Sequence, residues 1–135
     1  MLANSDITIY NRYLDSVTGY DKYSRCVVYG VNWFSRTKIN ITDGGLLSAN
    51  EYTLRIPLTA KFGKRYTNPK DFTATNESVC FTLKEGDIIV RGITTETNPV
   101  LAELFKNYNE VLTVVSVTDN RRGSPGVQHF KVVGK

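Results

Sequence analysis

The sequence has few of the residues on which most catalytic and metal sites depend. Its 135 residues include one histidine and two cysteines, Cys26 and Cys80, which lie far apart in the chain. No C-x-x-C or H-x-x-x-H spacing brings metal ligands together, so we predict no metal site. A phosphate-binding glycine loop and a dinucleotide fingerprint are also missing, so we predict no cofactor.

Long apolar runs are missing as well, and the first residues do not follow the pattern expected of a leader sequence. No apolar stretch approaches the roughly 20 residues that a membrane helix needs, so we predict no membrane contact. The first residues lack the basic start and apolar centre of a signal peptide, which predicts a reducing compartment and two free thiols. An excess of 17 Lys and Arg over 13 Asp and Glu permits a polyanionic partner without requiring one.

Nucleophilic catalysis has little support in the residues. A Ser-His or Cys-His pair would have to use His129, which lies in an alternating segment that favours a surface position. No cation adjoins Cys80 in sequence to activate its thiol. The nearby acids Glu85 and Asp87 are typical of a solvated turn rather than of a general acid and base. We therefore predict that the chain is not an enzyme, and a hydrolase that uses Cys80 or His129 is the weakest alternative.

The sequence is rich in strand-forming residues. Eight Tyr, six Phe and many β-branched residues are spread along its length. Alternation predicts a first hairpin from residues 7–11 and 23–33, with a bulge or bend at Gly30. The clearest alternation, over residues 52–58, predicts a further strand.

Two more hairpins are predicted in the second half of the chain. One joins residues 79–83 to residues 88–91, with Gly86 in its turn at a positive φ. The other joins residues 111–118 to residues 127–133.

One helix interrupts this pattern. Asn98 is a candidate N-cap with Pro99 at the first helical position. Helical spacing then places on one face Val100, Leu101, Leu104, Phe105 and Tyr108. Because no repeat or linker is present, we predict one domain over residues 1–135. It is mainly β, a small β-barrel or sandwich of about seven antiparallel strands with one short α-helix.

Two kinds of loop stand out. Residues 42–50 contain Gly44 and Gly45, little charge and two leucines, which predicts a mobile loop. A cationic loop follows, in which Phe62 and Tyr66 lie among Lys61, Lys64, Arg65 and Lys70. This mixture is used for nucleic-acid binding, although a solvated loop has the same composition. Arg121 and Arg122 form a second cationic tip.

Several stretches together resemble an uncharacterised family of small tailed-phage and prophage proteins. They cover most of the chain and are DITIYNRY at 6–13, GVNW at 30–33, SANEYTLRIP at 48–57, LKEGDIIVRG at 83–92, SVTDNRRGSP at 116–125 and KVVGK at 131–135. Members of that family look like products of the head-to-tail gene module. The expected strand order is also similar to that of head-closure, or stopper, proteins of long-tailed phages.

The resemblance implies a β-barrel subunit that assembles into a homo-oligomeric ring in the virion. The ring would lie below the portal and adaptor, close the DNA channel after packaging and receive the tail. Its partners would be other copies, the portal or adaptor and tail proteins, with transient contact to packaged DNA and no membrane. Assembly would take place in the cytoplasm of the bacterial host.

The resemblance also implies site residues. Stopper proteins place a flexible loop in the channel, and the matching candidates here are Thr42, Asp43, Gly44, Gly45, Leu46, Leu47 and Ser48. Candidates for contact with DNA or a neighbouring ring are Lys61, Lys64, Arg65, Lys70, Arg121 and Arg122. Two alternatives remain: a single-stranded nucleic-acid binding barrel, and a tail terminator or adaptor of the same phage module.

Overall fold

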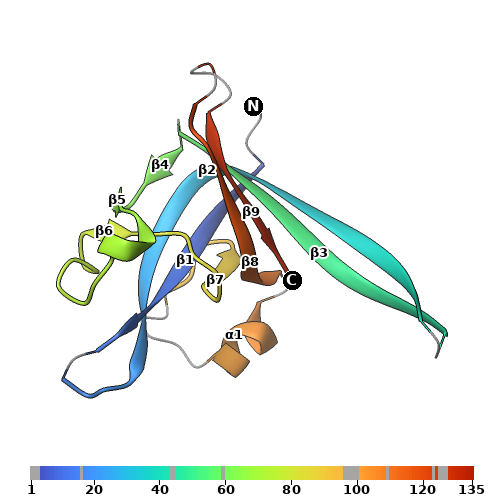
Figure 1. The fold of residues 1–135 in the computed structure, drawn as a ribbon, viewed down its shortest axis with the longest axis horizontal. Coiled ribbons are helices and arrows are strands. Elements are labelled where there is room, and N and C mark those ends of the chain that lie inside the picture. The colour runs from blue at the N-terminus through green and yellow to red at the C-terminus, as the bar shows by residue number, and fades with distance from the viewer. Residues whose placement is uncertain are drawn as a thin grey trace.

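The computed structural model describes residues 4–15, 17–42, 45–58, 60–95, 101–108, 110–122, 124 and 128–135. These residues are mainly in strands, as predicted (Figure 1). In chain order the elements are β1 (Ser5–Leu14), β2 (Asp21–Thr42), β3 (Gly45–Pro57), β4 (Lys61–Phe62), β5 (Arg65–Tyr66), a 3-10 turn (Pro69–Asp71), β6 (Cys80–Phe81), β7 (Ile88–Arg91), α1 (Leu101–Asn107), β8 (Val111–Asn120) and β9 (His129–Gly134).

Six of the described strands pair in a closed circuit. Hydrogen-bonded neighbours follow the order β1, β7, β8, β9, β3, β2, and β2 pairs again with β1. Every pairing in the circuit is antiparallel. Closure removes most of the free sheet edges from this part of the molecule, which we call the body. The circuit agrees with the predicted fold class of a small antiparallel β protein with one short helix.

The first predicted hairpin is confirmed. β1 and β2 pair along the whole of β1, from Ser5 opposite Val31 to Leu14 opposite Asp21. The register shifts between Ser5 and Asp6, which leaves Gly30 as the extra residue of a bulge in β2. Gly30 has a φ of 85°, a conformation that glycine adopts without steric penalty.

Alternation along the strands fills the interior of the body. In β3, Leu54 and Ile56 are fully buried and Arg55 between them is exposed, as the sequence pattern predicted. The main core cluster takes side chains from every strand of the circuit, together with Phe81 of β6 and Leu83. Its buried members are Ile7, Ile9, Cys26, Val28, Val31, Trp33, Leu54, Ile56, Phe81, Leu83, Ile89, Leu112, Val114, Phe130 and Val132. Each large apolar side chain buried in this way stabilises the fold by about 1.5–3 kcal/mol.

The helix and the last hairpin are also confirmed. In α1, Leu104 is buried against Tyr10, Ile88 and Val90, where it forms part of a second core cluster. The predicted N-cap residues 98–100 lie outside the described residues. β8 and β9 pair from Val114 to Asn120 with one register shift. The described part of the chain contains no helix long and apolar enough to cross a membrane.

The second predicted hairpin is wrong. β6 pairs in parallel with β5, and β7 pairs with β1 and β8 instead of with β6. Gly86 does have a positive φ, of 87°. The turn it belongs to does not close a hairpin, because the carboxylate of Asp87 is drawn into the body and bonded to β1 through Asn11 and Arg12.

The prediction of a mobile loop over residues 42–50 is also wrong for the described part of that segment. β2 continues to Thr42 and β3 begins at Gly45, and the two strands pair from Asn32 opposite Arg55 to Thr42 opposite Gly45. Leu46, Leu47 and Ser48 therefore belong to β3. Asp43 and Gly44 lie outside the described residues.

Candidate functional site

The far part of the β2–β3 hairpin extends beyond the body as a two-stranded arm, residues 35–42 and 45–51. β1 pairs with β2 only as far as Val31, and β9 pairs with β3 only as far as Tyr52. Beyond these points the two strands pair only with each other within the described chain. Figure 1 shows the arm leaving the other elements. At about 3.3 Å per residue, residues 35–42 span roughly 26 Å.

The root of the arm is held by Asn4 and by aromatic contacts. The side-chain Oδ1 of Asn4 accepts from the backbone N–H of Trp33 at 2.9 Å, and its Nδ2 donates to the Trp33 carbonyl at 3.2 Å. The buried Trp33 ring lies 5.3 Å from the ring of Tyr52 on the paired strand. The arm thus starts from a fixed base.

The six predicted cationic contacts divide into two groups. Lys61, Arg65, Lys70 and Arg122 are exposed. Their side chains make no hydrogen bond or ion pair with the other described residues, so their charges are available to a partner. Lys64 and Arg121 have partners inside the molecule.

Lys64 connects the segment that contains Glu77 to β2. Its Nζ donates to Ser24 Oγ at 2.7 Å and to the Glu77 carbonyl at 2.8 Å, and Ser24 Oγ donates to the same carbonyl at 2.9 Å. Desolvation by burial lowers the pKa of Lys64. A serine beside a lysine of lowered pKa is a known catalytic pairing, but Ser24 is 4% exposed and its hydroxyl does not reach solvent for attack on a substrate. The contact is structural.

Arg121 brings the two cationic segments together. Its guanidinium binds the Asp119 carboxylate through Nε and Nη2 at 2.6–2.9 Å and lies 5.2 Å from the ring centre of Tyr66 on β5. The hydrogen bond from Arg121 lowers the pKa of Asp119. The β8–β9 turn therefore lies against β5, so that Arg122 and Arg65 belong to neighbouring segments.

The aromatic residues of the cationic loop are packing residues. Phe62 stacks on Phe81 with ring centres 5.5 Å apart, and Tyr66 lies 4.6 Å from Phe130 and 5.6 Å from Phe81. Both rings pack against the main core. They do not provide the open stacking surface that the sequence suggested for nucleic-acid bases.

The other residues considered for chemistry are dispersed. Cys26 is buried, Cys80 is half-buried, and both are free thiols, as predicted. Burial raises the pKa of the Cys26 thiol, which makes it less reactive. The ring of His129 lies 3.3 Å from the side chain of Asn120. No three His, Cys, Asp or Glu side chains within the described ranges gather to hold a metal.

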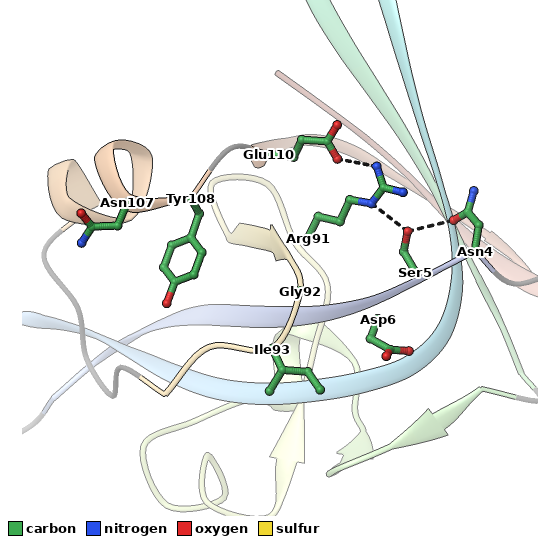
Figure 2. Close-up of a pocket in the computed structure, with 9 residues that line it drawn as sticks. All are labelled: Asn4, Ser5, Asp6, Arg91, Gly92, Ile93, Asn107, Tyr108 and Glu110. Atoms are coloured by element: carbon green, nitrogen blue, oxygen red, sulfur yellow. Dashed lines mark hydrogen bonds and ion pairs between the residues drawn. The ribbon is translucent and has the colours of Figure 1, made fainter.

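A polar hollow of about 640 Å³ was not predicted from the sequence (Figure 2). Arg91 crosses it, donating from Nη1 to Glu110 at 2.6 Å and from Nε to Ser5 Oγ at 2.8 Å. The arginine charge is thus balanced within the hollow. Sequence reasoning missed it because the lining comes from three separate segments: Asn4, Ser5, Asp6, Arg91, Gly92, Ile93, Asn107, Tyr108 and Glu110.

The comparisons with known proteins give one match. No curated protein and no solved structure matches the chain. A family model described as "Family of unknown function (DUF6751)" matches residues 2–135, almost the whole sequence. The chain therefore belongs to the DUF6751 family.

Proposed function

We propose that this protein is a structural subunit of the head-to-tail connector of a tailed phage, and that it acts as the head-closure protein. Copies assemble into a ring below the portal and adaptor. The ring closes the DNA channel after packaging and gives the tail its attachment surface. The subunit is made in the bacterial cytoplasm, ends in the virion and acts through shape rather than catalysis.

The arm is the observation that carries this proposal. The strands of the closed body already pair with one another, whereas the arm extends paired backbone well beyond the core. Protruding segments on a rigid β frame are where a ring-forming subunit contacts its neighbours or a channel. The segment is also the one that matches the channel loop of stopper proteins, although it is a hairpin here. The wider resemblance, which covers most of the chain, supports the phage context.

The exposed cations fit the same function. Lys61, Arg65, Lys70 and Arg122 offer positive charge at or near the β5 side of the body. Such charges bind an acidic neighbouring ring or the phosphates of packaged DNA, and salt weakens both interactions.

A single-stranded nucleic-acid binding barrel is the second candidate, and the same four cations favour it. The packing of Phe62 and Tyr66 against the core weakens it, because base stacking needs an open ring face. A binding isotherm with single-stranded DNA at two salt concentrations decides the matter. Tight, salt-sensitive binding supports this candidate, and its absence removes it.

Deletion of the gene from its phage tests the proposed function. We expect full-sized, DNA-filled heads and separate tails that fail to join, with joining restored by the gene supplied in trans. Normal virions from the deletion phage would contradict the proposal. Imaging of the complete particle separates a head-closure ring from a tail terminator or adaptor, because the three occupy different levels of the connector.

A further inference from the structure

We propose that neighbouring copies join their arms edge to edge, so that β2 and β3 of every subunit form one continuous antiparallel sheet around the ring. The partner of the arm is thus a second copy of the same chain. This inference rests on the ring assembly proposed above and identifies what holds adjacent subunits together.

The direction of the backbone groups on β2 follows from Trp33. Its N–H and carbonyl both point away from β3, since both bond to the side chain of Asn4. In an antiparallel ladder this orientation repeats at every second residue. The N–H and carbonyl groups that face outward along the arm on β2 are therefore those of Ser35, Thr37, Ile39 and Ile41.

The same alternation fixes the outer edge of β3. Residues directly opposite one another share their orientation, so the partners of the outward residues also face away from the hairpin. Tyr52, opposite Ser35, is the last of these that β9 covers, through Gly134. The groups left facing outward on β3 are those of Leu46, Ser48 and Asn50.

These two edges complement each other. They lie on opposite sides of one hairpin and run in opposite directions. A copy related by a head-to-tail rotation therefore sets its β2 edge antiparallel beside the β3 edge of its neighbour. Contacts of this kind close into rings. Three outward residues on β3 can exchange up to about six backbone hydrogen bonds with the next copy.

Charge and stability both favour a second copy as the partner. Residues 35–51, which include the arm, carry two cations, Arg36 and Lys38, and two acids, Asp43 and Glu51, so their formal charge is zero while the whole chain carries +4. Arms can therefore approach one another without the repulsion that two cationic surfaces would meet. A two-stranded hairpin is marginally stable alone in water, and added strands on both sides remedy this.

Hydrogen exchange resolved to single amides tests the pairing. In dilute monomer, we expect slow exchange at the hairpin-bonded amides of Arg36, Lys38 and Asn40, and fast exchange at the outward amides of Thr37 and Ile39. At high concentration, where light scattering reports a ring, the outward amides should slow at least tenfold. Rings whose outward amides still exchange as in the monomer would overturn this inference and leave the head-closure function intact. A chain that stays monomeric at every concentration overturns it as well.

Proline variants give a second, independent measurement. Asn50→Pro removes an N–H that faces outward and leaves the β2–β3 ladder unchanged, so the monomer should keep its thermal unfolding curve. We expect ring assembly to weaken at least tenfold. The matched control, Ala49→Pro, removes a ladder N–H and should open the arm itself, seen as fast exchange at Lys38. Unimpaired rings of Asn50→Pro would contradict the proposal, and the joining phenotype of the deletion phage reports separately on the function.

Discussion

The Asp87 side chain connects the turn before β7 to β1. It is fully buried, and its carboxylate accepts hydrogen bonds from Asn11 Nδ2, the Arg12 backbone N–H and the Lys84 backbone N–H, with the Lys84 ammonium at 3.2 Å. Burial raises the pKa of this carboxyl, and the nearby Lys84 charge and these hydrogen bonds oppose the rise. The residue therefore positions the segment before β7 against β1.

Replacement of Asp87 should destabilise the fold strongly. Asp87→Ala leaves three buried or half-buried donors without their acceptor, which costs about 3 kcal/mol of the free energy of unfolding. Glu85→Ala, two residues away and exposed, is the matched control and should change it by less than about 0.5 kcal/mol. Urea denaturation of both variants measures the difference. Equal effects of the two substitutions would mean that the Asp87 network contributes little.

Lys64 should make stability depend on pH in the alkaline range. Its pKa in the folded state is lowered from the ordinary value of 10.5, which we take for the unfolded chain. At a pH between the folded-state and the unfolded-state pKa, the unfolded chain therefore binds more protons than the folded chain. The free energy of unfolding of the wild type, relative to Lys64→Met, should therefore rise with pH through this window and stay level below it. Urea denaturation between pH 7 and 10.5 checks this, with Lys61→Met as the exposed control. A difference in the free energy of unfolding between wild type and Lys64→Met that stays constant over this pH range would contradict the prediction.

At the scale of elements, the Gly30 bulge sets where β2 bends. The extra residue lies where β1 stops pairing, just before the strand continues into the arm, and the Gly30 N–H donates to the Asp6 carboxylate at 3.1 Å. A bulge increases the local twist of a strand. The direction of the arm relative to the body therefore depends on this glycine.

Substitution of Gly30 should reveal its backbone conformation. At a φ of 85°, Gly30→Val should cost about 2 kcal/mol or more, because a β-branched residue is strained there. Gly30→Asn is the control and should cost less, since asparagine tolerates positive φ better. Thermal unfolding of the two variants measures the order, and a valine tolerated as well as asparagine would show that the bulge relaxes at little cost.

The elements that the sequence predicted correctly depend on local patterns. Alternation placed Leu54 and Ile56 in the core, helical spacing located α1, and an isolated glycine marked the bulge. The errors concern partners distant in sequence. The pairing of β6 with β5 and the burial of Asp87 depend on contacts that no local period encodes. The arm was missed because Gly44 and Gly45 were interpreted as flexibility, whereas Asp43 with Gly44 is a hairpin signal.

The candidate site was predictable to a similar extent. Composition alone found the cations Lys61, Arg65, Lys70 and Arg122, which are exposed. It did not show that Lys64 bonds internally, or that Arg121 lies over Tyr66, because both depend on tertiary contacts. The free edges of the arm were equally hidden, since they follow from where β1 and β9 stop pairing.

For the whole molecule, the exposed cations and the proposed assembly contacts lie in different parts. The arm has no net charge, and the exposed cations described above lie outside the arm. We therefore expect ring formation to depend weakly on salt and docking to an acidic partner to depend on it strongly.

Neutralising the four exposed cations should separate ring formation from docking. A variant with Lys61, Arg65, Lys70 and Arg122 all changed to Gln should form rings like the wild type. At about 0.15 M salt it should join heads to tails at least tenfold less efficiently, because the docking charges are gone. The fourfold variant is added to extracts of the deletion phage and compared there with Lys106→Gln, a substitution at an exposed position of α1. Undiminished joining by the fourfold variant would show that docking does not use these charges.

The closed circuit of strands also determines when, during synthesis, the subunit can complete its fold. β3 pairs with β9 in the circuit, so Leu54 can pair with Val132 only after that residue, 78 positions later in the chain, has been synthesised. Folding dominated by such distant pairings is slow. Until β9 emerges from the ribosome, the arm is already translated while the body remains open, so nascent chains on one polysome are at risk of premature strand exchange. Chaperone dependence during expression is the expected cost of this topology.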